Sequence, residues 1–303
     1  MRVSIIIPTQ RRPSGLAVAA ASALAQTGVD PSSVELIVAD NDAAPSAQAF
    51  VRELASTAPF PVIYLHVPEP GVANVRNGAL AKARGEWIAF LDDDQEAPAG
   101  WLAALLKAQA DFDADVVFGP VLARAPQAAP AHRAYLEQFF SRPGPHPAGP
   151  LDTYYGCGDS LIRRSAMGDR PFAAERNFIG GEDDMLFGRM QAAGRRFAWA
   201  PHAWVYEDPA PDRQRLGYAL ARAFAYGQGP STHCAVQTPP DRIGVVRWML
   251  IGMAQTAVYG VKAGLLWAVR SPRWPAVLDQ AARGLGKTFW WGPFKIGFYG
   301  RSA

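Results

Sequence analysis

Three consecutive aspartates, Asp92, Asp93 and Asp94, follow the apolar pair Phe90-Leu91 and are the strongest chemical signal in the sequence. Carboxylates this close repel one another and raise each other's pKa values unless a cation compensates them. Oxygen ligands suit Mg²⁺ or Mn²⁺, which take one or two carboxylates and complete their shell with water and phosphate oxygens. A metal held in this way can stabilise the charge that develops on a departing diphosphate. The alternative is an acidic turn exposed to solvent.

A second acidic cluster, Glu182, Asp183 and Asp184, follows Gly180-Gly181. The composition of residues 181–193 predicts a helix, so the three acids fall in its first turn. A carboxylate at such a position can deprotonate an acceptor hydroxyl as a general base. The competing interpretation is that the acids only complement the positive end of the helix dipole.

A basic and an amide side chain, Arg76 and Asn77, lie shortly after Gly71 near the start of another expected helix. An arginine there can clamp a phosphate through charge-assisted hydrogen bonds. Taken alone, the arginine is equally consistent with a surface salt bridge.

The elements that must position these side chains alternate between strand and helix patterns over the first 120 residues. Such alternation predicts βαβ crossovers and a mainly parallel sheet flanked by helices, an α/β fold. The expected strands are Val3–Ile7, Val34–Ala39, Val62–Leu65, Trp87–Leu91 and Asp115–Val121, and the expected helices are Leu16–Ala25, Ser46–Ser56, Val72–Ala83 and Trp101–Ala110.

Three polar clusters follow strands of this expected sheet. They are Pro8-Thr9, Asp40-Asn41-Asp42 and Asp92-Asp93-Asp94. Ligands of parallel α/β sheets bind beyond the carboxyl ends of the strands. The pattern therefore places all three clusters along one edge, where a ligand site is expected.

The middle of the chain is less regular. Residues 125–150 are rich in Pro, Ala and Gly, and we expect an irregular segment there around a short helix over 131–140. Strands are expected over 154–162 and 197–200, on either side of the helix over 181–193.

The most apolar segment, residues 243–269, is interrupted by Arg247 and Lys262, which leave 14 uncharged residues between them. A membrane span needs roughly 20 residues. Basic ends with intervening tryptophan and tyrosine suit an interfacial or re-entrant helix. From Asp241 to the end there are nine Lys and Arg against two acids, which favours an anionic surface as partner. The alternative is a buried helix of a soluble core.

Composition narrows the class and the setting of the protein. The two cysteines are too few for a disulfide framework and too far apart for a zinc pair, which predicts a reducing, cytoplasmic setting. The first residues run directly into a strand, and we find no secretory leader. No nucleic-acid-binding signature accompanies the basic C-terminal region, so nucleic acid is not expected as a partner.

Five segments form an ordered pattern: Ile5-Ile6-Ile7-Pro8-Thr9-Gln10-Arg11-Arg12, Val38-Ala39-Asp40-Asn41-Asp42, Gly71-Val72-Ala73-Asn74-Val75-Arg76-Asn77-Gly78, Ala89-Phe90-Leu91-Asp92-Asp93-Asp94 and Gly181-Glu182-Asp183-Asp184. Together they resemble the family 2 glycosyltransferases of GT-A fold. The chain also resembles the exopolysaccharide glucosyltransferases of the succinoglycan ExoM type, especially at Ala39-Asp40-Asn41-Asp42-Ala43, Leu91-Asp92-Asp93-Asp94 and Gly180-Gly181-Glu182-Asp183.

This resemblance implies a role for each matching residue. It implies a Rossmann-like GT-A catalytic domain over residues 1–210 and a helical, membrane-associating region over 211–303. Asp183 would be the catalytic base, with Glu182 orienting it or contacting the acceptor, and Asp94 with Asp92 would hold Mg²⁺ or Mn²⁺. The residues implied in nucleotide-sugar binding are Pro8, Thr9, Arg11, Asp40, Asp42, Arg76, Asn77, Asp92 and Asp93, with Asp40 near the uracil and Asp92 at the ribose.

Two positions depart from the pattern of that family. Where related enzymes often carry a metal-binding histidine, this chain has Tyr206-Glu207, so His202 or Glu207 is a substitute or the metal is held by Asp94 and phosphates alone. Where an asparagine often precedes a strand, this chain has Asp159, which we interpret as a sugar contact or a satisfied turn residue.

The resemblance implies an inverting transferase that moves glucose or N-acetylglucosamine from a UDP-sugar to a lipid-linked oligosaccharide. It would act in exopolysaccharide or adhesive surface-polysaccharide synthesis, as a peripheral or monotopic protein on the cytoplasmic face of the membrane. One alternative is a non-catalytic nucleotide-sugar or polysaccharide binding protein that regulates synthesis. Another is a glycoside hydrolase, which needs a carboxylate pair and no phosphate-facing arginine.

Overall fold

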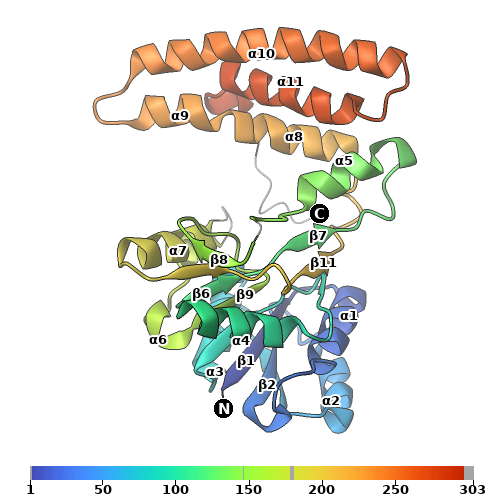
Figure 1. Cartoon of the computed structure of the whole chain (residues 1–303), viewed down its shortest axis with the longest axis vertical. Helices are drawn as coiled ribbons and strands as arrows, with labels where there is room; N and C mark the ends of the chain where they lie inside the picture. The colour runs from blue at the N-terminus through green and yellow to red at the C-terminus, as the bar shows by residue number, and fades with distance from the viewer. Residues whose placement is uncertain (1, 146, 178–180, 297–303) are drawn as a thin grey trace. The chain divides into compact units, whose positions relative to one another are not determined.

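The computed structural model describes residues 2–145, 147–177 and 181–296, and their contacts divide the chain into two compact units (Figure 1). Unit 1 comprises the described residues up to Leu122 together with those from Ser141 to Asp208. Unit 2 comprises Ala123–Phe140 and the described residues from Pro209 onward. Gly180 and residues 297–303 of the basic C-terminal region lie outside the described residues.

Unit 1 is built on an eight-stranded mixed sheet within the described residues. Strands β3, β2, β1 and β4 are parallel neighbours, whereas β9 runs antiparallel between β4 and β6, and β8 runs antiparallel beside β10. In sheet order the strands are β3 (Val62–His66), β2 (Val34–Asp40), β1 (Val3–Thr9), β4 (Trp87–Phe90), β9 (Ser160–Arg163), β6 (Val116–Phe118), β10 (Phe197–Trp199) and β8 (Gly149–Leu151).

Helices cover both faces of this sheet because its central strands are apolar on both sides. Along β1, Ile5 and Ile7 belong to one core cluster and Ile6 belongs to the other, as the period of two in a strand requires. The first cluster packs under α1 (Pro13–Leu24), α2 (Gln48–Thr57) and α4 (Trp101–Phe112), and the second under α3 (Val72–Lys82), α6 (Arg164–Met167) and α7 (Glu182–Ala192).

The first strand of a small second sheet directly follows the triple aspartate. Its order is β5 (Gln95–Glu96), β11 (Val205–Glu207) and β7 (Val121–Ala123). Glu207 lies opposite Gln95 in the β5–β11 pair, and the Asp208 N–H donates to the Asp94 carbonyl at 2.9 Å. The second sheet therefore brings residue 207 beside the end of the aspartate run.

Two of the expected strands differ from the structure. The strand expected over 115–121 is broken at Gly119-Pro120 into β6 and β7, because Pro120 has no N–H to donate to a ladder. The strand expected over 154–162 exists only as β9, since residues 154–159 are irregular and Asp159 has a positive φ of 63°. That left-handed conformation interrupts an extended run.

Unit 2 is helical, and it includes a segment from before the expected boundary at residue 210. The Tyr135 hydroxyl of α5 donates to Asp279 of α11 at 2.9 Å in a buried contact, which ties α5 to the C-terminal helices. The helices of this unit are α5 (Pro130–Phe140), α8 (Leu216–Gly227), α9 (Gly229–Val236), α10 (Arg242–Ala268) and α11 (Trp274–Thr288). Short 3₁₀ turns occupy η1 (Pro31–Ser33) and η2 (Ala174–Arg176) in unit 1 and η3 (Gly292–Phe294) in unit 2.

Helix α10 packs along α11 through small residues (Figure 1). A Cβ at Gly252 would lie 2.5 Å from the Gly284 carbonyl oxygen, so only glycine allows the two backbones to approach this closely. On the same side of α10, Thr256 donates to the Ala281 carbonyl at 3.3 Å and Gln255 donates to the Gln280 carbonyl at 2.8 Å. The side of α10 that faces the protein is therefore small and polar.

The other side of α10 is apolar and open. Ile243, Val261 and Leu265 are 84%, 67% and 66% exposed, and only 11% of the most apolar window of the helix is buried. By length and composition α10 is long and apolar enough to cross a membrane. The alternative of a buried helix in a soluble core is therefore wrong.

Candidate active site

The ends of the parallel strands bring the predicted polar clusters to one edge of unit 1. Thr9 lies beside Asp40 in the β1–β2 register, and β4 on the other side of β1 leads into the aspartates. The Thr9 hydroxyl donates to Asp93 at 2.8 Å, which joins the first cluster directly to the third. The expected grouping of these clusters at the carboxyl edge is what the structure has.

The three aspartates have unequal environments. The Asp93 side chain is 9% exposed, that of Asp94 is 19% and that of Asp92 is 31%. Burial raises the pKa of Asp93 to about 6, against the opposing charge of Arg12, and the charge of Asp94 raises it further. Burial and the charge of Asp92 also raise the pKa of Asp94. Burial and mutual repulsion therefore disfavour the charged form of Asp93 and Asp94, and the charge of Arg12 opposes that effect.

The two arginines that follow Thr9 separate toward different acids. Arg11 has a positive φ of 56° and its Nε lies 2.9 Å from Asp42. Arg12 turns back, and its Nη1 lies 2.9 Å from Asp93 and 2.7 Å from Asp94. Arg11, and not Arg12, was the residue predicted from the sequence to line the nucleotide-sugar site. The signal that could have found it is its position directly before the proline that starts α1.

Arg76 connects the aspartate run to the acids that begin α7. Its Nη1 donates to Glu182 at 2.6 Å and its Nη2 donates to Asp92 at 3.4 Å. The guanidinium carbon lies 5.9 Å from the Phe90 ring centre and 5.4 Å from that of Phe172, within cation–π range. The Arg76 side chain is only 6% exposed, so this is a buried charge with partners and not a surface salt bridge.

The acids that begin α7 are held by backbone groups and by Arg76. One Asp183 oxygen accepts the Cys157 N–H at 3.2 Å and the other accepts the Asp184 N–H at 2.9 Å. Burial raises the pKa of Glu182 even though Arg76 opposes it. Burial also raises the pKa of the Cys157 thiol, which keeps it neutral and fits a structural role.

Two predicted nucleotide contacts are already engaged in other bonds. Asn77 donates to the Phe172 carbonyl at 2.8 Å and accepts the Phe172 N–H at 3.1 Å, so both ends of its amide are bonded to the backbone of one residue. Asp40 has no exposed surface and accepts bonds from the Tyr64 hydroxyl and the Ala47 N–H at 2.9 and 2.8 Å. In this structure both residues support the loops around the site.

The structure places Asp159 below the site and not on its surface. It is 1% exposed, and one carboxylate oxygen accepts the Trp101 indole N–H at 2.7 Å. Burial raises the pKa of Asp159 well above its ordinary value, with the indole hydrogen bond opposing the shift. This burial argues against a sugar contact. The positive φ of 63° fits a turn residue, but the second carboxylate oxygen has no hydrogen-bond partner among the described residues, so its hydrogen bonding is incomplete.

The backbone at Gly158 lies close to the Asp92 carboxylate. A Cβ at residue 158 would clash with the Asp92 carboxylate, so a larger residue there would force that carboxylate to shift. Gln95 adds a second restraint, because its side-chain oxygen accepts the Asp92 N–H at 3.0 Å and its NH₂ donates to Glu207 at 3.3 Å. Gln95 and Gly158 were not predicted from the sequence, because the bond of Gln95 to Glu207 and the approach of Gly158 to Asp92 join residues that are distant in the chain.

The donor set of this edge fits a hard divalent cation. Burial and then the charge of Asp94 raise the pKa of Glu207 to about 7, which places a third carboxylate near Asp92 and Asp94. The guanidinium nitrogen of Arg12 between two of the carboxylates shows that the cluster accepts a cation. No group of three or more His, Cys, Asp or Glu side chains converges as a metal cage anywhere in residues 2–145, 147–177 and 181–296. An ion that completes its shell with diphosphate oxygens and water needs no such cage.

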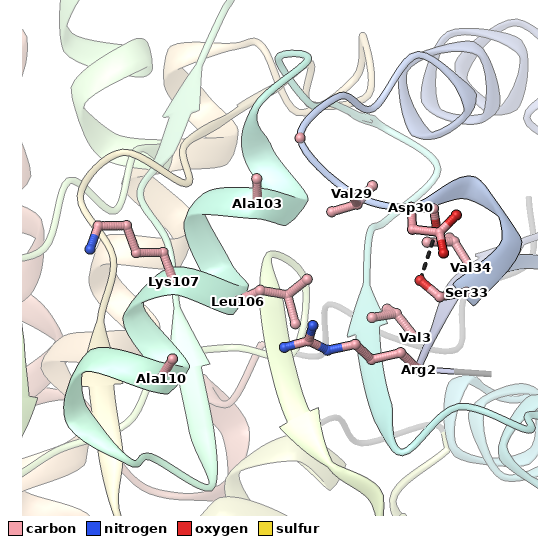
Figure 2. A pocket seen from close by; sticks show the side chains of 11 residues that line it. Arg2, Val3, Val29, Asp30, Ser33, Val34, Ala103, Leu106, Lys107 and Ala110 are labelled. Atoms are coloured by element: carbon pink, nitrogen blue, oxygen red, sulfur yellow. Dashed lines mark hydrogen bonds between the residues drawn. The ribbon is translucent and has the colours of Figure 1, made fainter.

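A separate pocket of about 370 Å³ lies at the opposite edge of the sheet (Figure 2). It is lined by Arg2 and Val3 at the start of β1, Val34 at the start of β2, and Lys107 of α4. The pocket is therefore remote from the carboxyl ends of the strands and does not belong to the acidic site.

Comparison with known proteins identifies the family. Residues 4–170, more than half of the chain, match the sequence profile of Glycosyl transferase family 2. The chain belongs to this family. The succinoglycan biosynthesis protein ExoM of Rhizobium meliloti (strain 1021) is 35% identical over 230 residues, which cover 75% of this chain and 74% of ExoM. The predicted family and its resemblance to ExoM are confirmed, and the glycoside hydrolase alternative is not supported.

Solved structures confirm the α/β GT-A fold of this glycosyltransferase. The structure of S. aureus TarS 1–349 in complex with UDP matches with a TM-score of 0.55 at 15% identity, over 94% of this chain and 89% of that chain. A longer TarS structure has a TM-score of 0.53 at 16% identity, and the match covers 81% of this chain but only 42% of the longer one. GalNAc-T7 with UDP, GalNAc and Mn²⁺ has a TM-score of 0.55 at 13% identity, over 76% of this chain and 51% of that chain.

Proposed function

We propose that this glycosyltransferase moves glucose or N-acetylglucosamine from a UDP-sugar to a lipid-linked oligosaccharide, with inversion at the anomeric carbon. The observation that carries the proposal is the double contact of Arg76 with Asp92 at 3.4 Å and Glu182 at 2.6 Å. The buried guanidinium of Arg76 thereby contacts an acid at the proposed metal end of the site and an acid beside the proposed base. The relationship to ExoM, named as a succinoglycan biosynthesis protein, supports exopolysaccharide or adhesive surface-polysaccharide synthesis as the process.

The donor end is assigned to the edge formed by β1, β2 and the aspartate run. Pro8 and Thr9 end β1, and Arg11 with its partner Asp42 forms the exposed rim, with 70% of the Arg11 side chain open. A nucleotide placed on this rim has its diphosphate directed toward Asp92 and Asp94. The TarS structures that contain UDP and UDP-GlcNAc support a UDP-sugar as the donor.

We assign metal binding to Asp94 and Asp92, with Mg²⁺ or Mn²⁺ as the ion. Their oxygens are of the hard type that these ions prefer. When bound, the ion stabilises the negative charge of the departing diphosphate. The Mn²⁺ in the GalNAc-T7 structure supports this assignment at the level of the fold.

The base is assigned to Asp183, which is half-buried at the start of α7. Its two oxygens accept backbone N–H groups from Cys157 and Asp184, which hold the carboxylate in a fixed orientation. The acceptor hydroxyl gives its proton to Asp183 and attacks the anomeric carbon on the face opposite the leaving diphosphate. Glu182 is held by Arg76 and orients this end of the site.

The lipid-linked acceptor and the membrane setting are supported by unit 2. Helix α10 presents apolar side chains outward and keeps Gln255 and Thr256 against α11, which is the reverse of a water-facing helix. Arg247 and Lys262 lie on the exposed side and match the anionic headgroups of a cytoplasmic leaflet. We therefore assign catalysis to residues 1–210 and peripheral or monotopic membrane association, on the cytoplasmic face, to residues 211–303.

The test is a panel of nucleotide sugars incubated with the full chain, Mn²⁺ or Mg²⁺, and a membrane lipid extract, with release of UDP or GDP as the readout. We expect UDP release from UDP-glucose or UDP-N-acetylglucosamine, dependent on both the metal and the extract. Chelation of the metal should abolish it. Release of GDP instead would contradict the assigned donor.

The same panel separates the enzyme from the alternative regulatory protein. A regulator binds UDP-sugar without turnover, so calorimetry would detect binding while no donor releases its nucleotide. That combination would overturn the catalytic proposal while retaining the nucleotide site.

A further inference from the structure

One nitrogen of Arg12 lies between two carboxylates of the aspartate run. Nη1 is 2.9 Å from the nearer Asp93 oxygen and 2.7 Å from the nearer Asp94 oxygen, so a single positive group bridges both acids. Bridging of this kind is the arrangement that a small cation adopts between two carboxylates. The Arg12 side chain is 36% exposed, which leaves the guanidinium room to move.

The turn after β1 determines which arginine reaches the aspartates. The positive φ of 56° at Arg11 reverses the chain direction, and Pro13 then starts α1 directly after Arg12. As a result Arg11 pairs with Asp42 and Arg12 pairs with Asp93 and Asp94. Two adjacent arginines therefore serve two separate acidic groups, and their exchange would require a different turn.

The acids differ in what else they can bind. Asp93 also accepts the Thr9 hydroxyl at 2.8 Å and is the most buried of the three, so its place is fixed from two sides. Asp94 is more exposed than Asp93, at 19%, and is assigned to the metal together with Asp92. A divalent cation that approaches Asp94 meets the positive charge of Arg12 at the same oxygen.

We propose that Arg12 is an internal counter-cation of the donor site, which a divalent metal displaces from Asp94 and which then binds the diphosphate of the nucleotide. This inference rests on the proposed metal-dependent, UDP-sugar function. A guanidinium released from a carboxylate can form paired hydrogen bonds with phosphate oxygens, so the diphosphate gives Arg12 a new partner. Metal and nucleotide then favour each other's binding. The metal frees Arg12 to bind the diphosphate, and the diphosphate holds Arg12 away from Asp94, so the coupling is reciprocal.

The test measures Mn²⁺ binding by electron paramagnetic resonance, with and without UDP, for the full chain and three variants. Arg12→Gln removes the counter-cation, Arg12→Lys keeps its charge, and Arg52→Gln, a change at an exposed residue of α2 with no role in the site, is the matched control. Without UDP, we expect Arg12→Gln to bind Mn²⁺ about 3- to 10-fold more tightly than the wild type, the effect of losing one partly exposed competing charge. We expect the tightening of Mn²⁺ binding by UDP to shrink in Arg12→Gln and to remain in Arg52→Gln and Arg12→Lys.

The outcomes distinguish this inference from the function on which it rests. If Arg12→Gln binds Mn²⁺ no more tightly than the wild type and keeps the full effect of UDP, the counter-cation role is wrong while the metal site stands. If neither the wild type nor Arg12→Gln binds Mn²⁺ even with UDP, the assigned metal site is wrong and the inference is wrong with it. Thermal unfolding of each variant checks that the substitutions leave the fold intact, and Arg12→Met provides a second neutral variant if Arg12→Gln is unstable.

Discussion

The acidic edge of unit 1 and the outer side of α10 in unit 2 follow opposite rules of burial. At the edge, charged groups such as Arg76 and Glu182 are 6% and 8% exposed and bonded to each other. Along α10, Ile243 and Val261 are 84% and 67% exposed, while Thr256 is turned inward to the Ala281 carbonyl. Burying a charge is costly unless it is paired, and exposing a large apolar surface to water is costly without a partner.

The two regions therefore indicate two different functions. A network of buried, paired charges indicates a site that must hold its geometry before substrate arrives. An outward apolar side with polar residues inside indicates a surface built for an apolar medium. Substitutions in the two regions should therefore have separable effects on transfer, folding and membrane partition.

The largest expected effect is on catalysis. Asp183→Asn removes the assigned base, and we expect UDP release with acceptor to fall about 10²- to 10⁴-fold, the usual contribution of general base catalysis. Partition to vesicles should not change, because the substitution lies outside unit 2. Asp184→Asn, one position later and exposed, is the matched control and should keep most of the activity. A full-rate Asp183→Asn enzyme would show that another group is the base.

The next effect is on stability. Arg76→Met leaves Glu182 buried without its partner, and loss of one member of a buried pair typically costs about 3–5 kcal/mol of unfolding free energy. Urea denaturation followed by circular dichroism measures the change. The double variant Arg76→Met, Glu182→Leu should recover much of the stability but none of the transfer activity. Equal stability of the single variant and the wild type would mean that the ion pair is not a structural element of the site.

Substitutions on α10 should have a smaller effect than those at the acidic edge, and they should change only the partition of the protein to lipid vesicles. Leu250→Asn with Val261→Asn makes two outward positions polar, which are 56% and 67% exposed. Each apolar side chain contributes about 1.5–3 kcal/mol on transfer from water, so partition to vesicles that contain phosphatidylglycerol should fall at least about tenfold. Val18→Asn changes a residue of α1 that is 46% exposed and serves as the control. Unchanged sedimentation of the double variant with vesicles would remove the membrane role of this side.

The smallest effect concerns a buried acid away from the site. Burial alone would raise the pKa of Glu35, but hydrogen bonds from Ser4 and Arg84 outweigh it and lower the pKa below its ordinary value of 4.5. A lowered folded-state pKa adds stability above that value, and this stability is lost as the pH falls through the folded-state pKa. The unfolding free energies of wild type and Glu35→Gln should therefore differ at pH 7 and converge in acid. Glu53→Gln, an exposed change on α2, gives the baseline.

Local patterns were enough to predict the edge that carries the site. Short apolar runs that end at Thr9, Asp40 and Asp92 predict parallel strands, and parallel strands end on the same side. The acids of α7 were predicted because helix starts have a recognisable composition. The broken strand at Gly119-Pro120 was missed because its apolar residues continue on both sides of the break.

The roles of individual side chains depended on neighbours that are distant in the chain. Asn77 has the same sequence context as Arg76, yet its amide joins the Phe172 backbone while Arg76 reaches Glu182. Asp159 is polar and follows a glycine, as many binding residues do, yet Trp101 from another element covers it. No local pattern reports such partners.

Local sequence patterns were sufficient to predict that acids and an arginine follow apolar strands, that three acids begin a helix, and that one long helix is apolar. These features follow from periodicity and from the chemistry of adjacent residue types, which are local. Only the tertiary structure decided that Arg12 and not Arg11 bridges Asp93 and Asp94, and that α10 turns its apolar side outward. The physical reason is that direction and burial are set by a left-handed turn at one residue and by close backbone packing at Gly252, both of which depend on three-dimensional contacts.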